Sequence, residues 1–104
     1  MKRLILTHIA QADLASIRRY SIRTWGPQQT ADYMDGLRET MKKLARGTAH
    51  VRTRDDLRPG LLLTNSGRHR IFFEADEIRI LVVRVLHDSM DYPRHLGAEG
   101  EDDA

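Results

Sequence analysis

Cysteine is absent from this 104-residue chain, which excludes disulfides and thiolate metal sites. Lysine is scarce, since only three of the 17 basic residues are lysines and the other 14 are arginines. Long hydrophobic runs are also missing, and the apolar stretch after Met1-Lys2-Arg3 soon turns polar. That stretch is too short for a signal peptide or a membrane span, so we expect a cytoplasmic protein with no membrane partner.

The net charge of +2 conceals an uneven distribution of acidic residues. Four of the 15 acidic residues lie within the last six positions, and without them the chain has 17 basic against 11 acidic residues. Arginine suits bidentate contact with carboxylate or phosphate. An acidic protein partner and a nucleic-acid backbone would both fit such a body, and a simple solvated arginine-rich surface has the same composition.

One apolar run, Ile78 to His87, is rich in branched residues and contains no Gly or Pro. Such a run is typical of a strand that is buried on both faces. Regular alternation puts Arg84 on the face of Val82 and Leu86, and His87 on the opposite face. A buried guanidinium needs a partner, and the acids that we expect to pair with it are Asp88, Asp91 or Glu74.

Two helices are predicted earlier in the chain, after a first strand at residues 3–7. The first begins at Thr7 or His8 and ends at about Trp25, and Asp13 near its start complements the helix dipole. The second spans about Pro27 to Arg46, with an apolar stripe that repeats every three or four residues. Gly26 and Pro27 form a sharp junction, so the helices make an antiparallel hairpin.

The second half of the sequence predicts a three-stranded antiparallel meander. Its strands are residues 61–64, 68–75 and 78–87, with a polar loop at 48–58 and a turn at 65–67. The fold class is therefore α+β, with an N-terminal strand, a helix hairpin packed on one sheet face, and the meander. We expect the first strand beside residues 61–64 and the opposite sheet face open to partners.

The end of the chain follows a different pattern. Residues 88–96 suggest a short helical turn, whereas residues 97–104 form an acidic tail with almost nothing to bury. We therefore expect a single domain over residues 1–96 followed by a disordered tail. The five histidines show no spacing typical of metal ligands, so we predict no metal, no cofactor and no small-molecule ligand.

The ordered set of elements and motifs resembles the ParE branch of the ParE/RelE superfamily of bacterial toxins. The resemblance covers nearly the whole chain except the tail, and its strongest part is the segment Arg84 to Asp91. The motifs that carry it are Ala12-Asp13-Leu14, Ile17, Tyr20, Trp25-Gly26, Tyr33, Leu37, residues 57–61, residues 67–73, residues 84–91 and His95-Leu96.

This resemblance implies a toxin that poisons DNA gyrase by protein binding and performs no chemistry itself. It also implies a hetero-oligomer with a ParD-type antitoxin, a ribbon-helix-helix protein. The residues that we expect to contact the target are Arg84, His87, Asp91, Arg94 and His95. The residues that we expect to contact the antitoxin are Tyr20, Trp25, Tyr33, Leu37 and Arg58.

The alternative function is that of the RelE-type relatives, which cleave mRNA on the ribosome. Such cleavage needs a base, an acid and cations that stabilise the phosphorane. The candidate catalytic residues here would be Arg84, His87, Arg70 and Tyr92. The catalytic lysines of those relatives are absent, and arginine stays protonated, so we favour gyrase poisoning. Each residue also has a structural interpretation: ion pairing for Arg84, a hydrogen-bonded strand end for His87, and closure of the helix hairpin for Tyr20 and Trp25.

Overall fold

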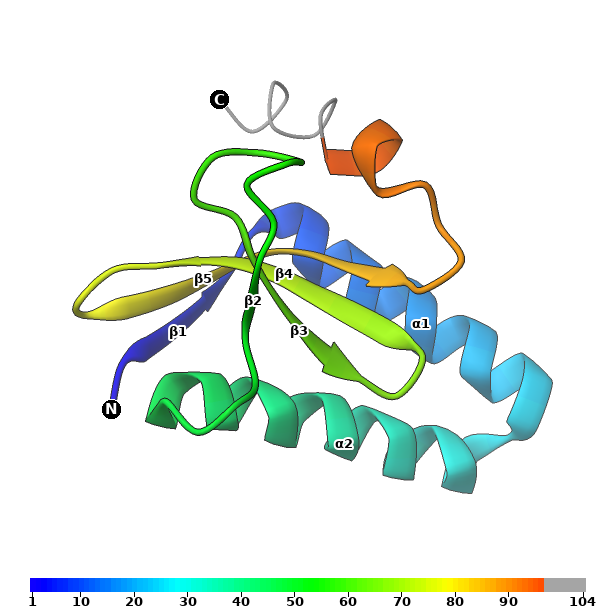
Figure 1. Ribbon diagram of the computed structural model, residues 1–104. Helices are drawn as coiled ribbons and strands as arrows, with labels where there is room; N and C mark the ends of the chain where they lie inside the picture. Colours follow the sequence, from blue (N-terminus) through cyan, green and yellow to red (C-terminus); the bar gives the residue numbers. More distant parts are fainter. Residues whose placement is uncertain (97–104) are drawn as a thin grey trace.

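The computed structural model describes residues 1–96 and has two layers, a helix hairpin and a mixed sheet. Both helices cover one face of the sheet and extend past its end (Figure 1). The elements are β1 Arg3–Leu6, α1 His8–Trp25, α2 Pro27–Arg46, β2 Arg52–Thr53, β3 Leu62–Ser66, β4 His69–Ala75 and β5 Arg79–His87. The predicted α+β class is confirmed. The acidic tail at 97–104 lies outside the described residues.

The sheet has the strand order β1-β5-β4-β3-β2. The antiparallel meander of β3, β4 and β5 is as predicted. The predicted place of β1 is wrong, because β1 pairs in parallel with β5, with Leu6 opposite Val82. A strand as apolar as β5 is best buried between two neighbours, and β1 provides the second one. The free edge of β3 is instead occupied by β2, which lies within the segment predicted as a loop.

Turn and cap residues set the element boundaries. Thr7 caps α1, since its hydroxyl oxygen accepts a hydrogen bond from the Ala10 N–H at 3.0 Å. Gly26 with φ 87° separates the helices, and Gly47 ends α2 in the left-handed conformation. The β3–β4 turn lies at Gly67 and Arg68, because Ser66 pairs with His69, one to two residues later than predicted.

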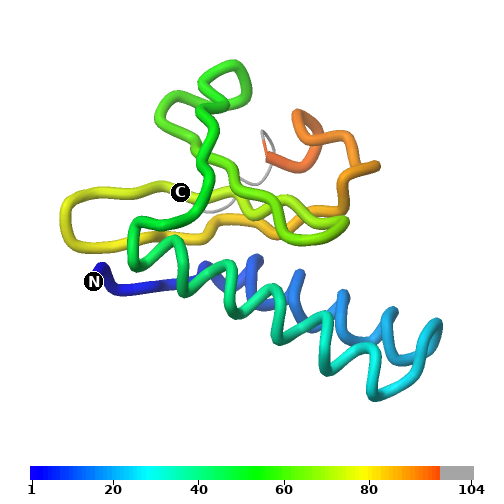
Figure 2. The backbone as a smooth tube through the Cα atoms, turned by 60° about the horizontal axis from the view of Figure 1, so that its bottom comes forward, coloured from blue at the N-terminus to red at the C-terminus, as the bar shows by residue number. Residues whose placement is uncertain are grey.

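Each face of the sheet has its own apolar core. Toward the helices, residues such as Leu37, Ile71 and Val82 are buried together. On the other face, Phe72, Leu86 and Leu96 form a second cluster beneath Tyr92 and Leu57. Figure 2 shows the loop after β2 and the segment after β5 on the side of the sheet opposite the helices. The expectation that this face is open is therefore wrong, because both segments cover it.

The segment after β5 carries the predicted helical turn over residues 92–96. Leu96 is 1% exposed, and the Tyr92 ring meets Phe72 edge-on with centroids 5.0 Å apart. These two apolar side chains anchor the segment on the second core. Within residues 1–96, neither helix combines the length and hydrophobicity that crossing a membrane requires.

A bulge in β5 reverses the regular alternation of its side chains. Phe72 lies opposite Arg84 and Phe73 opposite Val82, so Val83 is the extra residue. Ile80, Val82 and Val85 consequently face the helices, whereas Val83 and Leu86 belong to the second core. The predicted faces of the residues after Val83 were wrong, because a bulge leaves no signal in an apolar run.

Side chains from the start of α1 satisfy the backbone of this bulge. The Thr7 hydroxyl donates to the Val83 carbonyl at 2.9 Å, and the Val85 N–H donates to an Asp13 carboxylate oxygen at 2.9 Å. The strand ladder is thus replaced locally by side-chain hydrogen bonds rather than left unpaired. Asp13 lies beyond the first turn of α1 and serves this contact rather than the helix dipole.

Arg84 completes the contact between α1 and β5. Its Nε and Nη2 donate to the two Asp13 carboxylate oxygens at 2.8 and 2.9 Å. The side chains of Arg84 and Asp13 are only 9% and 14% exposed, and this bidentate geometry is the strongest form of such a pair. The prediction that Arg84 is paired is confirmed, but Asp88, Asp91 and Glu74 were the wrong partners, since Asp13 is 71 residues away in sequence.

Replacing Asp13 with Ala should lower the free energy of unfolding by about 3–5 kcal/mol, because it leaves a buried guanidinium without its counter-charge. Urea denaturation measures this change. The double variant Asp13→Leu/Arg84→Met should be less destabilised than Asp13→Leu alone. Asp35→Ala is the matched control, since its ion pair with Arg38 is exposed and should contribute under about 1 kcal/mol. Equal effects of Asp13→Ala and Asp35→Ala would contradict this account.

Candidate functional site

A cleft of about 820 Å³ opens between the far end of the helix hairpin and the ends of β4 and β5. We call it the aromatic cleft. Its apolar wall contains Ile17, Tyr20, Trp25 and Met90, and its polar residues include Tyr33, Arg68, His69, His87, Ser89 and Gln29. The cleft exists because both helices are longer than the strands that they cover, so their connected ends project past the sheet (Figure 1).

Tyr33 and His69 form the polar centre of the aromatic cleft. The Tyr33 Oη lies 2.6 Å from His69 Nδ1 and accepts a hydrogen bond from the Arg68 N–H at 3.0 Å. The His69 ring in turn meets the His87 ring edge-on, with centroids 5.3 Å apart. These contacts tie α2 to the β3–β4 turn and to the end of β5.

Burial changes the proton affinities of this pair. Desolvation, followed by the nearby His87, lowers the pKa of His69 to about 4, so its imidazole is neutral at pH 7. Desolvation also raises the pKa of Tyr33 above its ordinary value. A neutral histidine can both donate and accept a hydrogen bond, so the centre of the cleft presents polar but uncharged groups.

Gly67 allows Tyr33 to approach the turn. Its φ of +56° is a conformation that glycine adopts freely. A Cβ atom at this position would lie 2.7 Å from Tyr33 Cε1 and 2.8 Å from its Oη. Only glycine therefore fits both the turn and the space beside the Tyr33 ring. The sequence had predicted a turn here but not this close contact.

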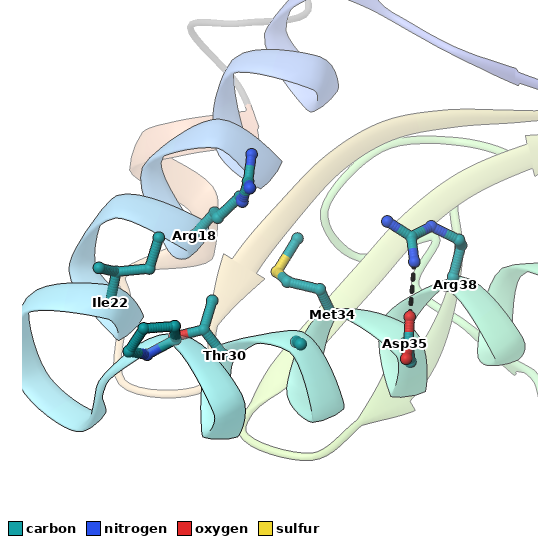
Figure 3. A pocket seen from close by; sticks show the side chains of 8 residues that line it. Arg18, Ile22, Thr30, Met34, Asp35 and Arg38 are labelled. Atoms are coloured by element: carbon teal, nitrogen blue, oxygen red, sulfur yellow. Dashed lines mark hydrogen bonds and ion pairs between the residues drawn. The ribbon is translucent and has the colours of Figure 1, made fainter.

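A second hollow, the outer groove, lies between α1 and α2 on the side away from the sheet. It has a volume of about 390 Å³ and contains Ile22, Ala31 and Met34 between the arginines Arg18 and Arg38. Figure 3 shows Arg18 on α1, and Arg38 held by Asp35 on α2. An apolar base beside the exposed Arg18 suits an amphipathic segment that carries an acidic residue.

The residues predicted to contact an antitoxin are dispersed in the structure. Tyr20 and Trp25 are 56% and 54% exposed and meet edge-on at the end of the hairpin. Leu37 is 1% exposed and belongs to the core, so a surface role for it is wrong. Arg58 pairs with Glu74 at 2.8 Å, in the loop that covers the second core. A buried stripe of α2 was mistaken for a surface.

The residues predicted to contact the target fall into two groups. Asp91, Arg94 and His95 lie together on the segment after β5, where the Arg94 N–H donates to Asp91 at 3.4 Å. His87 lines the aromatic cleft, and its Nδ1 is 2.8 Å from the Ser89 hydroxyl. Arg84 is 8% exposed and bonded to Asp13, so it positions α1 and is not on the surface.

The candidate ribonuclease residues are not brought together. His87 lies in the cleft on the helix side, whereas Tyr92 packs on the second core. Arg70 alternates with Ile71 along β4 and so lies on the Tyr92 side of the sheet. Within residues 1–96, no group of three or more His, Asp or Glu side chains is placed to hold a metal ion.

Comparisons with known proteins agree on one family. The family described as "ParE toxin of type II toxin-antitoxin system, parDE" matches residues 4–92. Toxin ParE1 of Caulobacter vibrioides is 37% identical over 97 residues, covering 93% of this chain and all of that protein. Toxin ParE1 of Mycobacterium tuberculosis is 35% identical, covering 90% and 97%, and Toxin ParE of Escherichia coli is 37% identical, covering 88% and 89%.

A solved structure shares the fold. A chain from the structure titled "Chromosomal ParDE TA system from P. aeruginosa" superimposes with a TM-score of 0.69. The match covers 84% of this chain and 96% of that one, at 23% sequence identity. This likeness supports the arrangement of two helices on a mixed sheet.

Gly67→Ala should destabilise the protein by about 1–3 kcal/mol, because it strains the turn and forces the Tyr33 ring away. Chemical denaturation gives the magnitude, and the NMR signals of the His69 ring report whether Tyr33 has moved. Gly36→Ala is the control, since nothing lies within 4 Å of the added Cβ there and the change should stabilise α2 by about 0.5–1 kcal/mol. A Gly67→Ala variant as stable as the parent would disprove the close approach.

Proposed function

Because this chain belongs to the ParE toxin family of type II toxin–antitoxin systems, we propose that it arrests growth by binding DNA gyrase. We further propose that it acts without chemistry of its own and that a ParD-type antitoxin neutralises it. The observation that favours gyrase binding over ribonuclease activity is the position of Arg84. Its guanidinium is bound to Asp13, so it is not presented to a phosphate.

The proposed target surface is the segment after β5 together with His87. Asp91 and Arg94 are exposed on this segment, while Tyr92 and Leu96 fix it to the second core. Because buried side chains fix this segment, its exposed polar groups are preorganised. Less conformational entropy is then lost when a large partner binds. The guanidinium of Arg54, 5.9 Å from the centre of the Tyr92 ring, adds to this support.

The proposed antitoxin surface is the outer groove. An antitoxin tail that folds on binding would place apolar side chains on Ile22 and Met34 and a carboxylate near Arg18. Ile22 is 41% exposed although it is a large aliphatic residue. Tyr20 and Trp25 stand at the same end of the hairpin, on the cleft side of α1.

Inducing the chain alone in a bacterium should stop growth, with filamentation, an SOS response and cleaved DNA. With purified gyrase, the chain should increase the amount of cleaved DNA, and Arg94→Ala should weaken this effect at least about fivefold. Arg52→Ala is the control, since it removes an exposed arginine elsewhere. Rapid loss of translation with cut messages and intact DNA would instead establish the ribonuclease alternative.

Ile22→Asp should leave the chain toxic but weaken its neutralisation by the antitoxin at least about tenfold, because it puts a charge on the apolar base of the outer groove. Titration of the purified antitoxin against each variant measures the affinity. Val51→Asp, at a residue of similar exposure outside the groove, should bind normally. Equal affinities of the two variants would exclude the outer groove as the antitoxin surface.

A further inference from the structure

The distal half of α1 carries positive charge that no side chain within residues 1–96 neutralises. From Leu14 to Trp25 the helix has three arginines, Arg18, Arg19 and Arg23, and no acidic residue. All three are exposed, and within residues 1–96 none of them forms an ion pair. Several other exposed arginines pair with a nearby carboxylate, among them Arg38, Arg46 and Arg79. Three charges that have no counter-charge among the described residues are therefore gathered on one helix.

Aromatic side chains alternate with these arginines. The sequence from Arg18 to Trp25 reads Arg-Arg-Tyr-Ser-Ile-Arg-Thr-Trp. Helical spacing places Arg23 beside Tyr20, three residues before it, and beside Arg19, four residues before it. The Arg19 guanidinium bonds the Ser16 hydroxyl at 3.2 Å, and Ser16 lines the aromatic cleft. Arg19 and Arg23 thus follow the edge of the cleft that contains the two exposed rings, whereas Arg18 lines the outer groove.

The opposite edge of the cleft carries Arg68, whose charge is partly offset by Asp88, which also lies 3.1 Å from His87 Nδ1. Arg68 has a side chain that is 74% exposed, and its contact with Asp88 is long, at 3.4 Å. Among the described residues, none that lines the cleft is acidic. Inside it, Ser89 and Gln29 offer hydrogen bonds, and His87 retains Nε2 because its Nδ1 is engaged by Ser89.

We propose that the aromatic cleft binds single-stranded nucleic acid, with a base against Tyr20 and Trp25 and the phosphates over Arg19, Arg23 and Arg68. Exposed aromatic rings inside a cationic groove are the general means of holding unpaired bases. A duplex keeps its bases stacked and could meet only the arginines. This site goes beyond the proposed binding of gyrase and antitoxin, and it is separated from the outer groove by α1.

An acidic peptide is the competing occupant, because it would also match the charge. An acidic peptide, however, has no planar group that could stack on the aromatic rings of the cleft while bonding to its polar side chains. The outer groove, with aliphatic side chains between arginines, suits a peptide helix better. The combination of rings, neutral polar groups and flanking cations favours a nucleotide.

Trp25 is the only tryptophan of the chain, so its fluorescence reports occupancy of the cleft directly. The purified protein is titrated with a ten-nucleotide oligo(dT), a duplex of equal length, and a ten-residue polyglutamate. We expect the single strand alone to quench Trp25. Its affinity should fall with salt, with a log–log slope of roughly −2 for three phosphate contacts.

Variants assign the effect to named side chains. Tyr20→Ala, which keeps the reporter, should weaken binding of oligo(dT) by about 5- to 150-fold. Arg19→Ala or Arg23→Ala should reduce the salt slope by about 0.7 each, while Arg52→Ala should change neither quantity. Circular dichroism confirms that each variant is folded.

Three results would overturn the proposal: no quenching by oligo(dT), equal quenching by polyglutamate or by the duplex, or full affinity of the Tyr20→Ala variant. Quenching by polyglutamate alone would make the cleft a site for an acidic peptide. These outcomes are independent of the growth assay. If the chain traps cleaved DNA on gyrase but does not bind oligo(dT), the nucleic-acid site is refuted and the proposed function is retained.

Discussion

The contact between Asp13 and Arg84 holds the two layers of this protein together. One carboxylate accepts hydrogen bonds from Nε and Nη2 of a guanidinium and from a backbone N–H of the β5 bulge. The charges are nearly buried, so desolvating them is costly and the bidentate geometry is needed to offset that cost. Such an arrangement tolerates one register of β5 and one placement of α1. The bulge, the helix and the pair therefore depend on one another.

This constraint determines where the molecule can act. Since the bulge changes which residues of β5 face the helices, Val85 enters the first core and Leu86 the second. Leu86 and its neighbours then bind the segment after β5 through Leu96 and Tyr92. The helix placement fixed by Asp13 leaves the far end of the hairpin projecting, and this opens the aromatic cleft. Neither surface would exist with β5 shifted by one residue.

Local signals in the sequence were sufficient for most of the fold. The caps and glycines around α1 and α2 and the branched run of β5 predicted the elements nearly to the residue. Long-range pairings were not predictable in this way. The parallel pairing of β1 with β5 and the partner of Arg84 join residues more than 70 positions apart, and local propensity contains no information about such distances.

The candidate site was predicted less well for a related reason. Chemical type identifies residues that can bind, but only burial decides which of them are available. Arg84 and Leu37 were chosen for their type and are buried, whereas His69 was passed over although Tyr33 and His87 make it central to the cleft. The interleaved arginines and aromatics of α1 were visible in the sequence as a local signal. That these residues border a cleft could be inferred only from the structure, in which α1 projects beyond the sheet.

The distribution of ion pairs within residues 1–96 shows which arginines have their charge offset by a neighbouring carboxylate. A paired arginine on the surface contributes little to stability but presents little net charge to a partner. Arg54 and Arg58 in the loop before β3 and Arg79 at the start of β5 are paired in this manner. Along the distal part of α1 the sequence supplies no acid within one helical turn of Arg19 or Arg23. Arg19 and Arg23 are four residues apart and repel each other, and the proposed anionic partner would relieve this repulsion.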